Sequence, residues 1–255
     1  MMRIDQLLVQ RGLASTRSQA QRLIGSGVQC RTDGAWKRVV KNGDLVSPDC
    51  DIELLDTSEA RFVSRGGLKL EGALVHAGLG VAGLVCLDLG QSTGGFTDCL
   101  LQRGAAQVVG VDVGFGQLHE QLRQDARVTC VERVNARQMT AEDLPEGCAG
   151  PFDLIVGDLS FISQTLVLPA AVPLLKAGGA VLMLVKPQFE LQPGQVGKGG
   201  IVTDPAMYPV VEKRIRAAHA KLGLRVQSYF ASSIDGGDGN REFFVHSIRH
   251  TEVTP

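Results

Sequence analysis

The sequence predicts an α/β protein with a doubly wound, mainly parallel β-sheet, preceded by a small α+β domain. Three observations support this prediction. Between residues 60 and 250, strand-like and helix-like stretches alternate, as they do in sheets with helices on both faces. The stretch Val181–Val185 is entirely apolar, which is typical of a strand buried on both faces. The first sixty residues have their own charge pattern, which indicates a separate domain.

Length and composition bound the domain organisation. The chain has 255 residues, enough for two domains, and its 44% hydrophobic and 21% charged content is typical of a globular protein. We expect residues 1–59 to form the first domain, residues 60–67 a linker and residues 68–250 the second domain. The net charge of −1 gives no overall basic signal for nucleic acid. The oligomeric state stays open.

Cysteine usage and the amino terminus indicate the compartment. The six cysteines form no C-x-x-C pair, and several lie in apolar strand-like stretches. We therefore expect reduced core cysteines, no metal site and a cytoplasmic protein. The amino terminus lacks the pattern of a signal peptide, and the longest uncharged stretch, 159–175, is too polar for a membrane span.

The first domain is expected to begin with two short helices. Ile4, Leu7 and Leu8 form the apolar stripe of the first helix. The stretch STRSQAQRLIGSG follows, with Thr16 at the capping position and Gln19 three residues later, as in a capping box. The buried face of this second helix is expected to consist of Ala20, Leu23 and Ile24.

Charge is unevenly distributed in this domain. Residues 1–41 hold eight Lys or Arg and two acids, whereas residues 42–60 hold six acids and no Lys or Arg. A basic surface of this kind binds phosphates, although a solvated helix face explains the charges equally well. The candidate RNA-binding residues are Arg3, Arg11, Arg17, Arg22, Lys37, Arg38 and, in the linker, Arg65.

A glycine-rich turn, DLGQSTGGF from Asp88 to Phe96, joins the first strand of the second domain to a helix. Its glycines permit close approach of the backbone to a ligand, and the helix start offers free N–H groups. The spacing matches neither the G-x-G-x-x-G dinucleotide fingerprint nor a phosphate loop. The D-x-G pattern suits a cofactor with an amino-acid end and no pyrophosphate, which points to S-adenosyl-L-methionine. A turn without a ligand is the alternative.

Two further polar residues are expected at strand ends beside this turn. Asp112 ends the next strand, where an acid can accept hydrogen bonds from the ribose of an adenosine. Asn135 ends the third strand, where it can contact the adenine edge. Alone, Asp112 is equally well explained as a turn residue, but together with Asp88 it favours a ligand. The candidate cofactor-binding residues are Asp88, Gly90, Ser92, Thr93, Gly94, Gly95, Phe96, Asp112, Asn135 and Asp158.

Two lysines and two acids are expected to converge beside the cofactor. Lys186 follows the buried strand Val181–Val185 and Asp158 follows the strand before it, so both lie at the carboxyl edge of the sheet. Lys69 lies at the start of a helix, and Glu242 at the start of the closing strand. A charge at the end of a buried strand is unfavourable unless it has a function. A structural ion-pair cluster is the alternative.

The amino-terminal stretch resembles a known module. RIDQLLVQRGLASTRSQAQRLIGSGVQC is similar to the small RNA-binding domain of ribosomal small-subunit protein S-four, which implies RNA binding by about residues 2–58. The family usually has a Val-x-Val-Asn-Gly turn after its second helix. This chain has VQCRTDGAW there, with Asp33 and Gly34 as the expected turn.

The second domain carries a further resemblance. The order Lys69, Asp158, Lys186, Glu242 resembles the K-D-K-E set of FtsJ-like ribose 2′-O-methyltransferases. More narrowly, VSRGGLKL, DLGQSTGGFTD, VDVGFGQL, GDLSFIS, LVKPQFE, GGIV and EFF are similar to blocks of the TlyA family. Members of that family combine an S-four-like domain with a methyltransferase, often carry the name haemolysin, and methylate cytidine 2′-hydroxyls in ribosomal RNA. The resemblance implies a Rossmann-like, S-adenosylmethionine-dependent enzyme that acts on ribosomal RNA or ribosomal subunits.

The chemistry of that reaction suits these four residues. A ribose hydroxyl must be aligned with an electrophilic methyl group and must lose a proton. A lysine can assist if burial or a nearby cation lowers its pKa. We expect Lys186 to be the base or to stabilise the alkoxide, while Lys69 adds positive charge. Asp158 is expected to orient Lys186, and Glu242 to orient Lys69 or the ribose. Which lysine takes the proton stays open, as does the target nucleotide.

Other functions are compatible with parts of the sequence. An RNA-binding, ribosome-associated factor without catalysis needs only the first domain, but all four candidate catalytic positions hold competent residues. A membrane-active haemolysin needs a spanning segment, which the sequence lacks. Methyltransferases for base amines commonly have N/D-P-P-Y/F where this chain has GDLSF. We also expect Ser58–Gly67 to act as a hinge or a passive linker, and Gln192–Val202 to be a mobile loop near the substrate.

Overall fold

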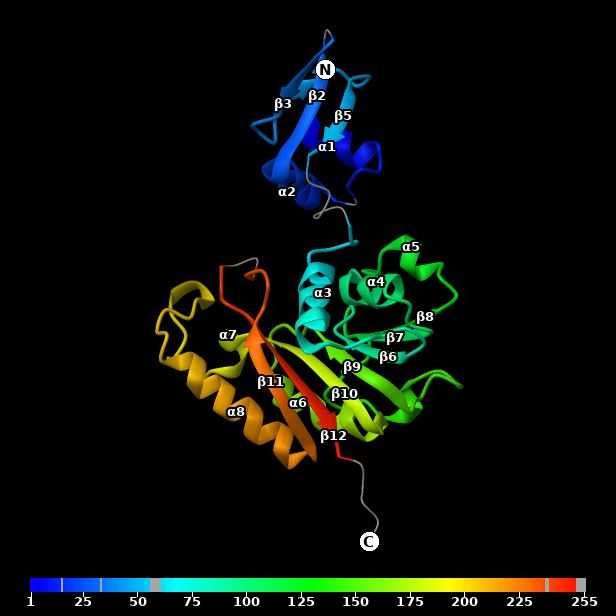
Figure 1. Cartoon of the computed structure of the whole chain (residues 1–255), viewed down its shortest axis with the longest axis vertical. Coiled ribbons are helices and arrows are strands. Elements are labelled where there is room, and N and C mark those ends of the chain that lie inside the picture. The colour runs from blue at the N-terminus through cyan, green and yellow to red at the C-terminus, as the bar shows by residue number, and fades with distance from the viewer. Residues whose placement is uncertain (15, 33, 56–60, 237–238, 251–255) are drawn as a thin grey trace. The chain divides into compact units, whose positions relative to one another are not determined.

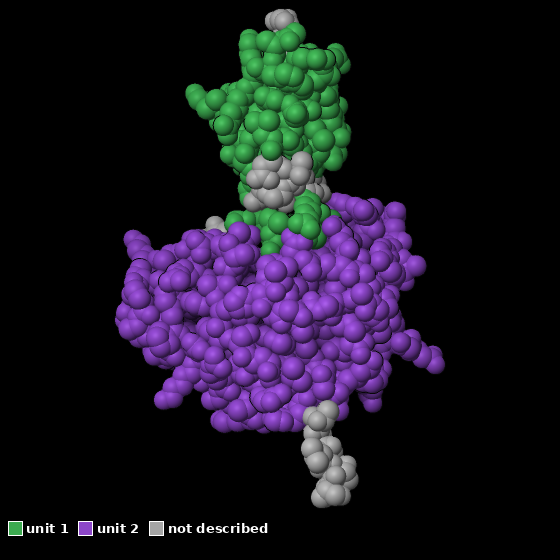
Figure 2. Space-filling view, viewed as in Figure 1, with its two compact units in different colours: residues 1–68 green, residues 69–255 purple. Residues whose placement is uncertain are grey.

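The computed structural model describes residues 1–14, 16–32, 34–55, 61–236 and 239–250. The chain divides into two compact units, unit 1 (Met1–Leu68) and unit 2 (Lys69–Pro255), which Figure 2 shows in different colours. The division falls just past the linker expected at 60–67, and the start of the expected hinge, 58–60, lies outside the described residues. The domain limits at 59 and 68 stay a prediction.

Before the start of α3, the described residues of unit 1 form two helices and two small antiparallel sheets (Figure 1). Its elements are β1 (Met2–Arg3), α1 (Ile4–Gln10), α2 (Arg17–Gly27), β2 (Val28–Thr32), β3 (Ala35–Arg38), β4 (Leu45–Val46) and β5 (Asp51–Leu54). The three-stranded sheet has the order β3-β2-β5, and β1 pairs with β4. Strands β2 and β3 are antiparallel neighbours, as a hairpin requires, but Asp33 of the expected turn lies outside the described residues.

The two predicted helices of unit 1 are confirmed, and their apolar faces meet in its core. The hydroxyl of Thr16 accepts a hydrogen bond from the backbone N–H of Gln19 at 3.1 Å, so Thr16 caps α2 as expected. The side-chain nitrogen of Gln19 donates to the carbonyl oxygen of Phe62 at 3.2 Å. The core residues on the two helices include Ile4, Leu7, Leu8, Ala20, Leu23 and Ile24.

Asp5 is a fully buried carboxylate that organises the basic residues of unit 1. It accepts hydrogen bonds from Arg3 at 3.0 Å and from Arg17 at 2.9 Å. Arg11 donates to backbone carbonyls in the segment 48–50. Three of the candidate RNA-binding arginines therefore make contacts that stabilise unit 1, which the charge pattern alone did not indicate.

Replacing Asp5 by alanine is expected to destabilise unit 1 and to reduce its sensitivity to acid. The hydrogen bond from Arg3, assisted by the one from Arg17, holds the pKa of Asp5 well below its usual range. The stabilisation is therefore present above the unfolded pKa of about 3.9 and is lost as the pH falls below it. Urea unfolding at pH 7 and pH 3.5, followed by Trp36 fluorescence, measures unit 1 alone because Trp36 is the single tryptophan of the chain.

The matched control for this experiment is Asp51→Ala. Asp51 pairs with Arg31 at 2.7 Å, but both side chains are at least half exposed. Exposed ion pairs contribute little to stability, so this variant should unfold close to wild type. An Asp5→Ala protein with the same urea midpoint and pH dependence as wild type would show that the buried Asp5 carboxylate does not stabilise unit 1.

Unit 2 is a doubly wound α/β domain, as predicted (Figure 1). Its elements are α3 (Gly66–Ala77, which begins in unit 1), β6 (Val85–Leu89), α4 (Gly95–Gln102), β7 (Gln107–Asp112), α5 (Glu120–Arg123), β8 (Val128–Glu132), β9 (Phe152–Gly157), α6 (Gln164–Ala171), β10 (Leu175–Val185), α7 (Pro187–Glu190), α8 (Met207–Lys221), β11 (Leu224–Ala231) and β12 (Phe243–Arg249). The seven-stranded sheet has the order β11-β12-β10-β9-β6-β7-β8. Strand β12 runs antiparallel to both of its neighbours, β10 and β11, and the other pairs of neighbouring strands are parallel.

The sheet order locates the expected ligand crevice. The chain proceeds from β6 outward to β7 and β8, and then returns to the other side of β6 with β9 and β10. A ligand binds most readily where the direction of winding reverses, beyond the carboxyl ends of the strands. That point lies between β6 and β9, where the glycine-rich turn and Asp158 follow their strands.

The central strand β10 behaves as its apolar sequence predicts. Each residue of Val181–Val185 is at most 2% exposed, and β10 pairs with β9 on one side and β12 on the other. Burial on both faces and both edges leaves no room for a charge within this stretch. Lys186 is the first residue after the strand and therefore the first position at which a charged group can leave the core.

The cysteines of both units are unpaired. All six are free thiols, of which Cys30, Cys50, Cys86 and Cys99 are buried. Cys130 and Cys148 are half-buried. Burial raises the pKa of the Cys86 thiol to about 12, so this cysteine is an unreactive core residue.

A buried polar network connects α6, α8 and β12. His219 of α8 is fully buried, with its Nδ1 2.6 Å from the hydroxyl of Ser247 and its Nε2 3.3 Å from Oε1 of Gln164. Because the amide oxygen can only accept, Nε2 carries the proton and Nδ1 accepts from Ser247. Burial lowers the pKa of His219 to about 4, so the ring is neutral at physiological pH.

Unit 2 is expected to lose stability as the pH falls from about 6.5 towards 4. In that range the unfolded state binds a proton on His219 that the folded state does not bind. The free energy of unfolding therefore falls by up to about 1.4 kcal/mol for each pH unit. His219→Gln should be less stable at pH 7.5 but should lack this part of the pH dependence. Urea unfolding by far-UV circular dichroism at pH 7.5 and 5.5 measures the difference, and Trp36 fluorescence identifies the unit 1 transition. Equal pH dependence in both proteins would count against a neutral buried His219.

Candidate active site

Asp88 is the first residue of the glycine-rich turn and the last but one of β6. It is fully buried, and its Oδ2 accepts a hydrogen bond from the hydroxyl of Thr97 at 2.7 Å. Gln91 donates to the same hydroxyl at 2.9 Å, which directs the proton of Thr97 towards Asp88. Burial raises the pKa of Asp88 to about 7, against the effect of the Thr97 hydrogen bond. Among the described residues, Oδ1 of Asp88 has no hydrogen-bond partner.

Gly90 brings the turn into close contact with the segment after β9. Its φ is +80°, a conformation that favours glycine. A Cβ atom at this position would lie 2.8 Å from the carbonyl oxygen of Asp158, too close for a real contact. The turn therefore approaches the β9 end of the crevice only because residue 90 has no side chain.

Asp112, the last residue of β7, is held in a fixed orientation by backbone N–H groups. Its Oδ2 accepts from Ser92 at 2.7 Å and its Oδ1 accepts from Gly114 at 2.6 Å. The hydroxyl of Ser92 donates to Gln117 at 3.1 Å. Each carboxylate oxygen keeps a lone pair that can accept a ribose hydroxyl, as an acid at this strand end was predicted to do.

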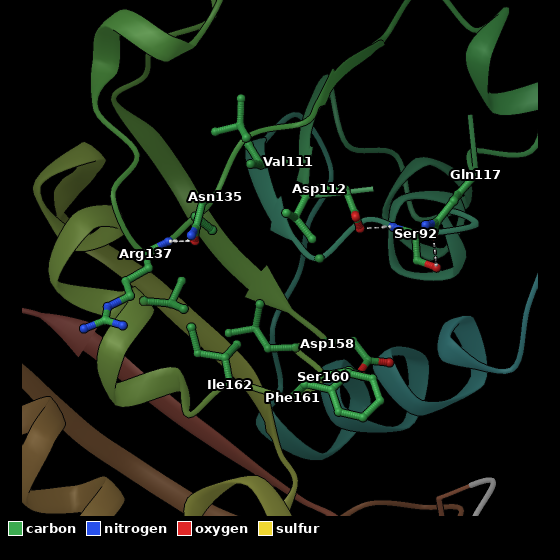
Figure 3. A pocket seen from close by; sticks show the side chains of 16 residues that line it. Ser92, Val111, Asp112, Gln117, Asn135, Arg137, Asp158, Ser160, Phe161 and Ile162 are labelled. Carbon is green, nitrogen blue, oxygen red and sulfur yellow. Dashed lines mark hydrogen bonds between the residues drawn. The ribbon is translucent and has the colours of Figure 1, made fainter. Parts of the chain in front are cut away.

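A cavity of about 320 Å³ lies beside these residues, and Figure 3 shows its lining. Asp112 and Ser92 lie at one end, Asn135 and Arg137 at another, and Asp158 with Ser160 below them in this view. A cavity of this size accepts a small organic cofactor. The candidate cofactor-binding residues that line it are Gly90, Ser92, Asp112, Asn135 and Asp158.

The other candidate cofactor-binding residues are not among the residues that line this cavity. These are Asp88, Thr93, Gly94, Gly95 and Phe96. Gly94 lies where a Cβ would come 2.4 Å from Leu122, so its small size serves packing. Phe96 is 3% exposed and stacks on Phe244, with ring centroids 6.3 Å apart. Phe96 therefore belongs to the core under α4.

The predicted position of Asn135 at a strand end is wrong. Strand β8 ends at Glu132, and Asn135 lies in the loop that follows it. Its side-chain oxygen accepts from the backbone N–H of Arg137 at 3.1 Å, and both residues line the cavity. The strand is shorter than expected because Arg133 has a φ of +62°, which no strand residue adopts.

Lys186 forms one of two ion pairs in the predicted catalytic set. Its Nζ lies 2.5 Å from Oδ1 of Asp158 and donates to the hydroxyl of Ser160 at 2.9 Å. Asp158 and Ser160 both line the cavity, so Lys186 is held at its edge. Ser160 had no distinguishing signal in the sequence, because only the course of the chain after β9 brings it to Lys186.

Lys69 and Glu242 form the second ion pair. Nζ of Lys69 lies 2.5 Å from Oε2 of Glu242, and both side chains are less than 10% exposed. Burial raises the pKa of Glu242, while the hydrogen bond and charge of Lys69 and then the charge of Lys186 oppose the shift. Asp158 acts on Glu242 as well, so the four predicted residues share one electrostatic environment.

The segment Gln192–Val202 is attached to the loop that carries Glu242. Asn240 is 2% exposed, its Oδ1 accepts from Val202 at 2.9 Å and its Nδ2 donates to Gly200 at 2.9 Å. The buried amide of Asn240 accepts one of these hydrogen bonds and donates the other, and together they fix the end of the segment in place. Its predicted mobility stays a prediction.

Comparison with known proteins identifies the chain. A family model described as FtsJ-like methyltransferase matches residues 62–249, and one described as S4 domain matches residues 2–27. The chain is 46% identical over 243 residues to the 16S/23S rRNA (cytidine-2′-O)-methyltransferase TlyA of Mycobacterium tuberculosis, covering 95% of this chain and 88% of that relative. The chain belongs to the TlyA family of FtsJ-like methyltransferases.

Two further proteins that are similar to this chain carry a different name. Hemolysin A of Brachyspira hyodysenteriae is 38% identical over 250 residues, with coverage of 97% of this chain and 100% of that one. A solved structure of a hemolysin-named protein from Streptococcus thermophilus has a TM-score of 0.75 and 40% identity, over 97% of this chain and 88% of that one. Among the residues that the structure describes, no helix combines the length and apolar character needed to cross a membrane.

Proposed function

We propose that this TlyA-family protein transfers a methyl group from S-adenosyl-L-methionine to the ribose 2′-hydroxyl of a cytidine in ribosomal RNA. The observation that carries the proposal is the position of Lys186, bound to Asp158 at 2.5 Å and Ser160 at 2.9 Å on the edge of the cavity. The Mycobacterium tuberculosis relative is named for this reaction and is 46% identical. Ribosomal RNA lies in the cytoplasm, where we therefore expect the protein to act.

The residues of the crevice fit S-adenosyl-L-methionine. When bound, this cofactor supplies a methyl group on a positively charged sulfonium. Asp112, oriented by two backbone N–H groups, can accept the ribose hydroxyls of its adenosine. Gly90 permits close approach to the backbone, and Oδ1 of Asp88, which has no partner in the described part of the chain, can accept from the amino group of the methionine end. Asn135 lines the cavity at the position proposed for the adenine.

The ion pairs support the roles that we propose for the four predicted catalytic residues. Lys186 forms an ion pair with Asp158 and donates a hydrogen bond to Ser160, and in our proposal a further N–H is directed to the 2′-oxygen of the substrate. Its charge stabilises the alkoxide that develops as the hydroxyl passes its proton to a water molecule. Lys69, held by Glu242, adds positive charge to the same environment. Asp158 and Glu242 thereby keep the two lysines oriented.

Unit 1 is proposed to bind the RNA. Lys37 and Arg38 lie on β3, an edge strand whose four residues are all exposed, where they can contact phosphates. Arg22 and Arg65 are half-buried and stay candidates for the same role. A cytidine must leave its stack for its 2′-hydroxyl to reach Lys186.

The test is methyl transfer from labelled S-adenosyl-L-methionine to purified small and large ribosomal subunits from cells that lack this protein. We expect label in a ribose 2′-O position with wild type and none with Lys186→Ala. The subunit that is labelled identifies the substrate. No label on either subunit, with cofactor binding intact, would favour an RNA-binding factor without catalysis or another acceptor. Leakage of liposomes with the pure protein would instead support a membrane-active haemolysin.

A further inference from the structure

The segment that follows β9 and the segment that follows β10 are joined to each other along their length. The first, Asp158–Ser163, we call the wall loop because its residues 158–162 form one side of the cavity. The second consists of Lys186 and α7. At the start of the wall loop, Lys186 binds Asp158 and Ser160. The first contact point between the segments is therefore the candidate catalytic lysine itself.

Glu190, the last residue of α7, forms the second contact point at the far end of the wall loop. Its side chain is 3% exposed. Oε1 accepts from the backbone N–H of Gln164 at 3.0 Å, and Oε2 accepts from the hydroxyl of Ser163. Ser163 in turn caps α6 by accepting from the N–H of Thr165 at 3.2 Å. Glu190 thus binds the wall loop at the residue where it enters α6.

Glu190 is itself anchored to α8. Arg214 donates to the carbonyl oxygen of Glu190, and His219 binds the side chain of Gln164 at 3.3 Å. Both partners of the Glu190–Gln164 contact are therefore attached to the same 15-residue helix. This arrangement gives Glu190 a fixed position from which it can define the end of the wall loop.

A buried carboxylate at this position needs an explanation. Removing a charged group from water is unfavourable unless strong hydrogen bonds replace the water. Burial raises the pKa of Glu190, and the hydrogen bonds from Ser163 and then from Gln164 oppose that shift. Hydrogen bonds to a carboxylate are shorter and stronger than those to a neutral amide. The contact is thus suited to hold two segments in a defined geometry.

We propose that Glu190 is a positioning residue for methyl transfer: it holds the wall loop against the segment after β10, so that Asp158 and Ser160 stay within reach of Lys186. The proposal rests on the proposed function, because it concerns the geometry of the same site. Because the wall loop also lines the cavity, we expect Glu190 to affect both cofactor affinity and the rate of methyl transfer, and the two effects can be measured separately.

Two substitutions of Glu190 test the proposal. Glu190→Ala removes both hydrogen bonds and should slow single-turnover methyl transfer at saturating cofactor and ribosomal subunit by at least tenfold. Calorimetric binding of S-adenosyl-L-methionine, which needs no transfer, should weaken several-fold because the wall loop lines the cavity. Glu190→Gln keeps an oxygen for Gln164 and should recover most of both properties. Far-UV circular dichroism and urea unfolding identify any variant that fails to fold.

A double-mutant cycle with Ser160→Ala separates positioning from general stability. If Glu190 acts through the wall loop, Ser160→Ala should cost less activity in the Glu190→Ala protein than in wild type. Glu212→Ala, which removes an exposed pair with Arg216 on α8, is the matched control and should change neither rate nor affinity. Additive losses in the cycle, or wild-type affinity and rate in Glu190→Ala, would overturn the proposal.

The two proposals fail in different ways. If wild type does not methylate either subunit, the proposed function fails, and the cofactor affinity of Glu190→Ala still decides whether Glu190 positions the wall loop. If wild type methylates and Glu190→Ala is unchanged, only the positioning role is wrong.

Discussion

Lys186→Ala is expected to reduce methyl transfer to ribosomal subunits by at least about 100-fold, while cofactor affinity changes by less than about threefold. The ammonium group is the charge that Asp158 and Ser160 hold at the cavity edge, and no apolar side chain can stabilise a developing alkoxide there. Lys186 is absent from the residues that line the cavity, so its removal should leave most cofactor contacts intact. Single-turnover transfer and calorimetric cofactor binding measure the two quantities.

The matched control is Lys176→Ala. Lys176 lies at the other end of β10 and forms an exposed pair with Asp153 at 2.6 Å. It is a lysine of the same strand with the same kind of partner, but it is remote from the cavity. A Lys186→Ala enzyme that retains near-wild-type transfer would make Lys186 a structural residue, and the ion-pair cluster would then serve stability alone.

Gly90→Ala is expected to weaken S-adenosyl-L-methionine binding by at least about tenfold. The new Cβ would lie 2.8 Å from the carbonyl oxygen of Asp158, and alanine rarely adopts the φ of +80° at this residue. The turn or the wall loop must move, and both line the cavity. Calorimetry with the intact protein measures the loss.

Gly80→Ala is the matched control for that substitution. Residue 80 is exposed, and a Cβ there meets no atom within 4 Å. The same chemical change at this position should leave cofactor affinity unaltered. Equal affinity of Gly90→Ala and wild type would show that the glycine-rich turn does not contact the cofactor.

Much of the secondary structure follows from local pattern. The apolar residues of α1 and α2 recur at helical spacing, and Thr16 caps α2 because its hydroxyl reaches an N–H three residues away. Val181–Val185 is a strand because five consecutive apolar side chains need burial on both faces. Interactions of this kind involve residues near in sequence, so the sequence alone is enough to predict these helices, caps and strands.

Only some of the contacts in the candidate site could be predicted from the sequence. Lys186 and Asp158 were expected at neighbouring strand ends, since parallel strands present their carboxyl ends together, and the structure pairs them at 2.5 Å. Ser160 and Glu190 lie in the family-like blocks GDLSFIS and LVKPQFE, but their contacts could not be predicted because these depend on how the chain turns after β9 and after β10. Asn135 was placed at a strand end because the sequence does not show the positive φ of Arg133.

Residue type and spacing therefore predicted the fold class and the gathering of two lysines and two acids at one edge of the sheet, whereas the family and the catalytic roles of these four residues came from the resemblance to known methyltransferases. The tertiary structure decided which lysine pairs with which acid, and that Phe96 packs in the core. It also decided that Arg3 and Arg17 hold the buried Asp5. The physical reason is that periodicity and strand order depend on neighbours in sequence, whereas ion pairs and packing depend on distances between residues far apart in the chain.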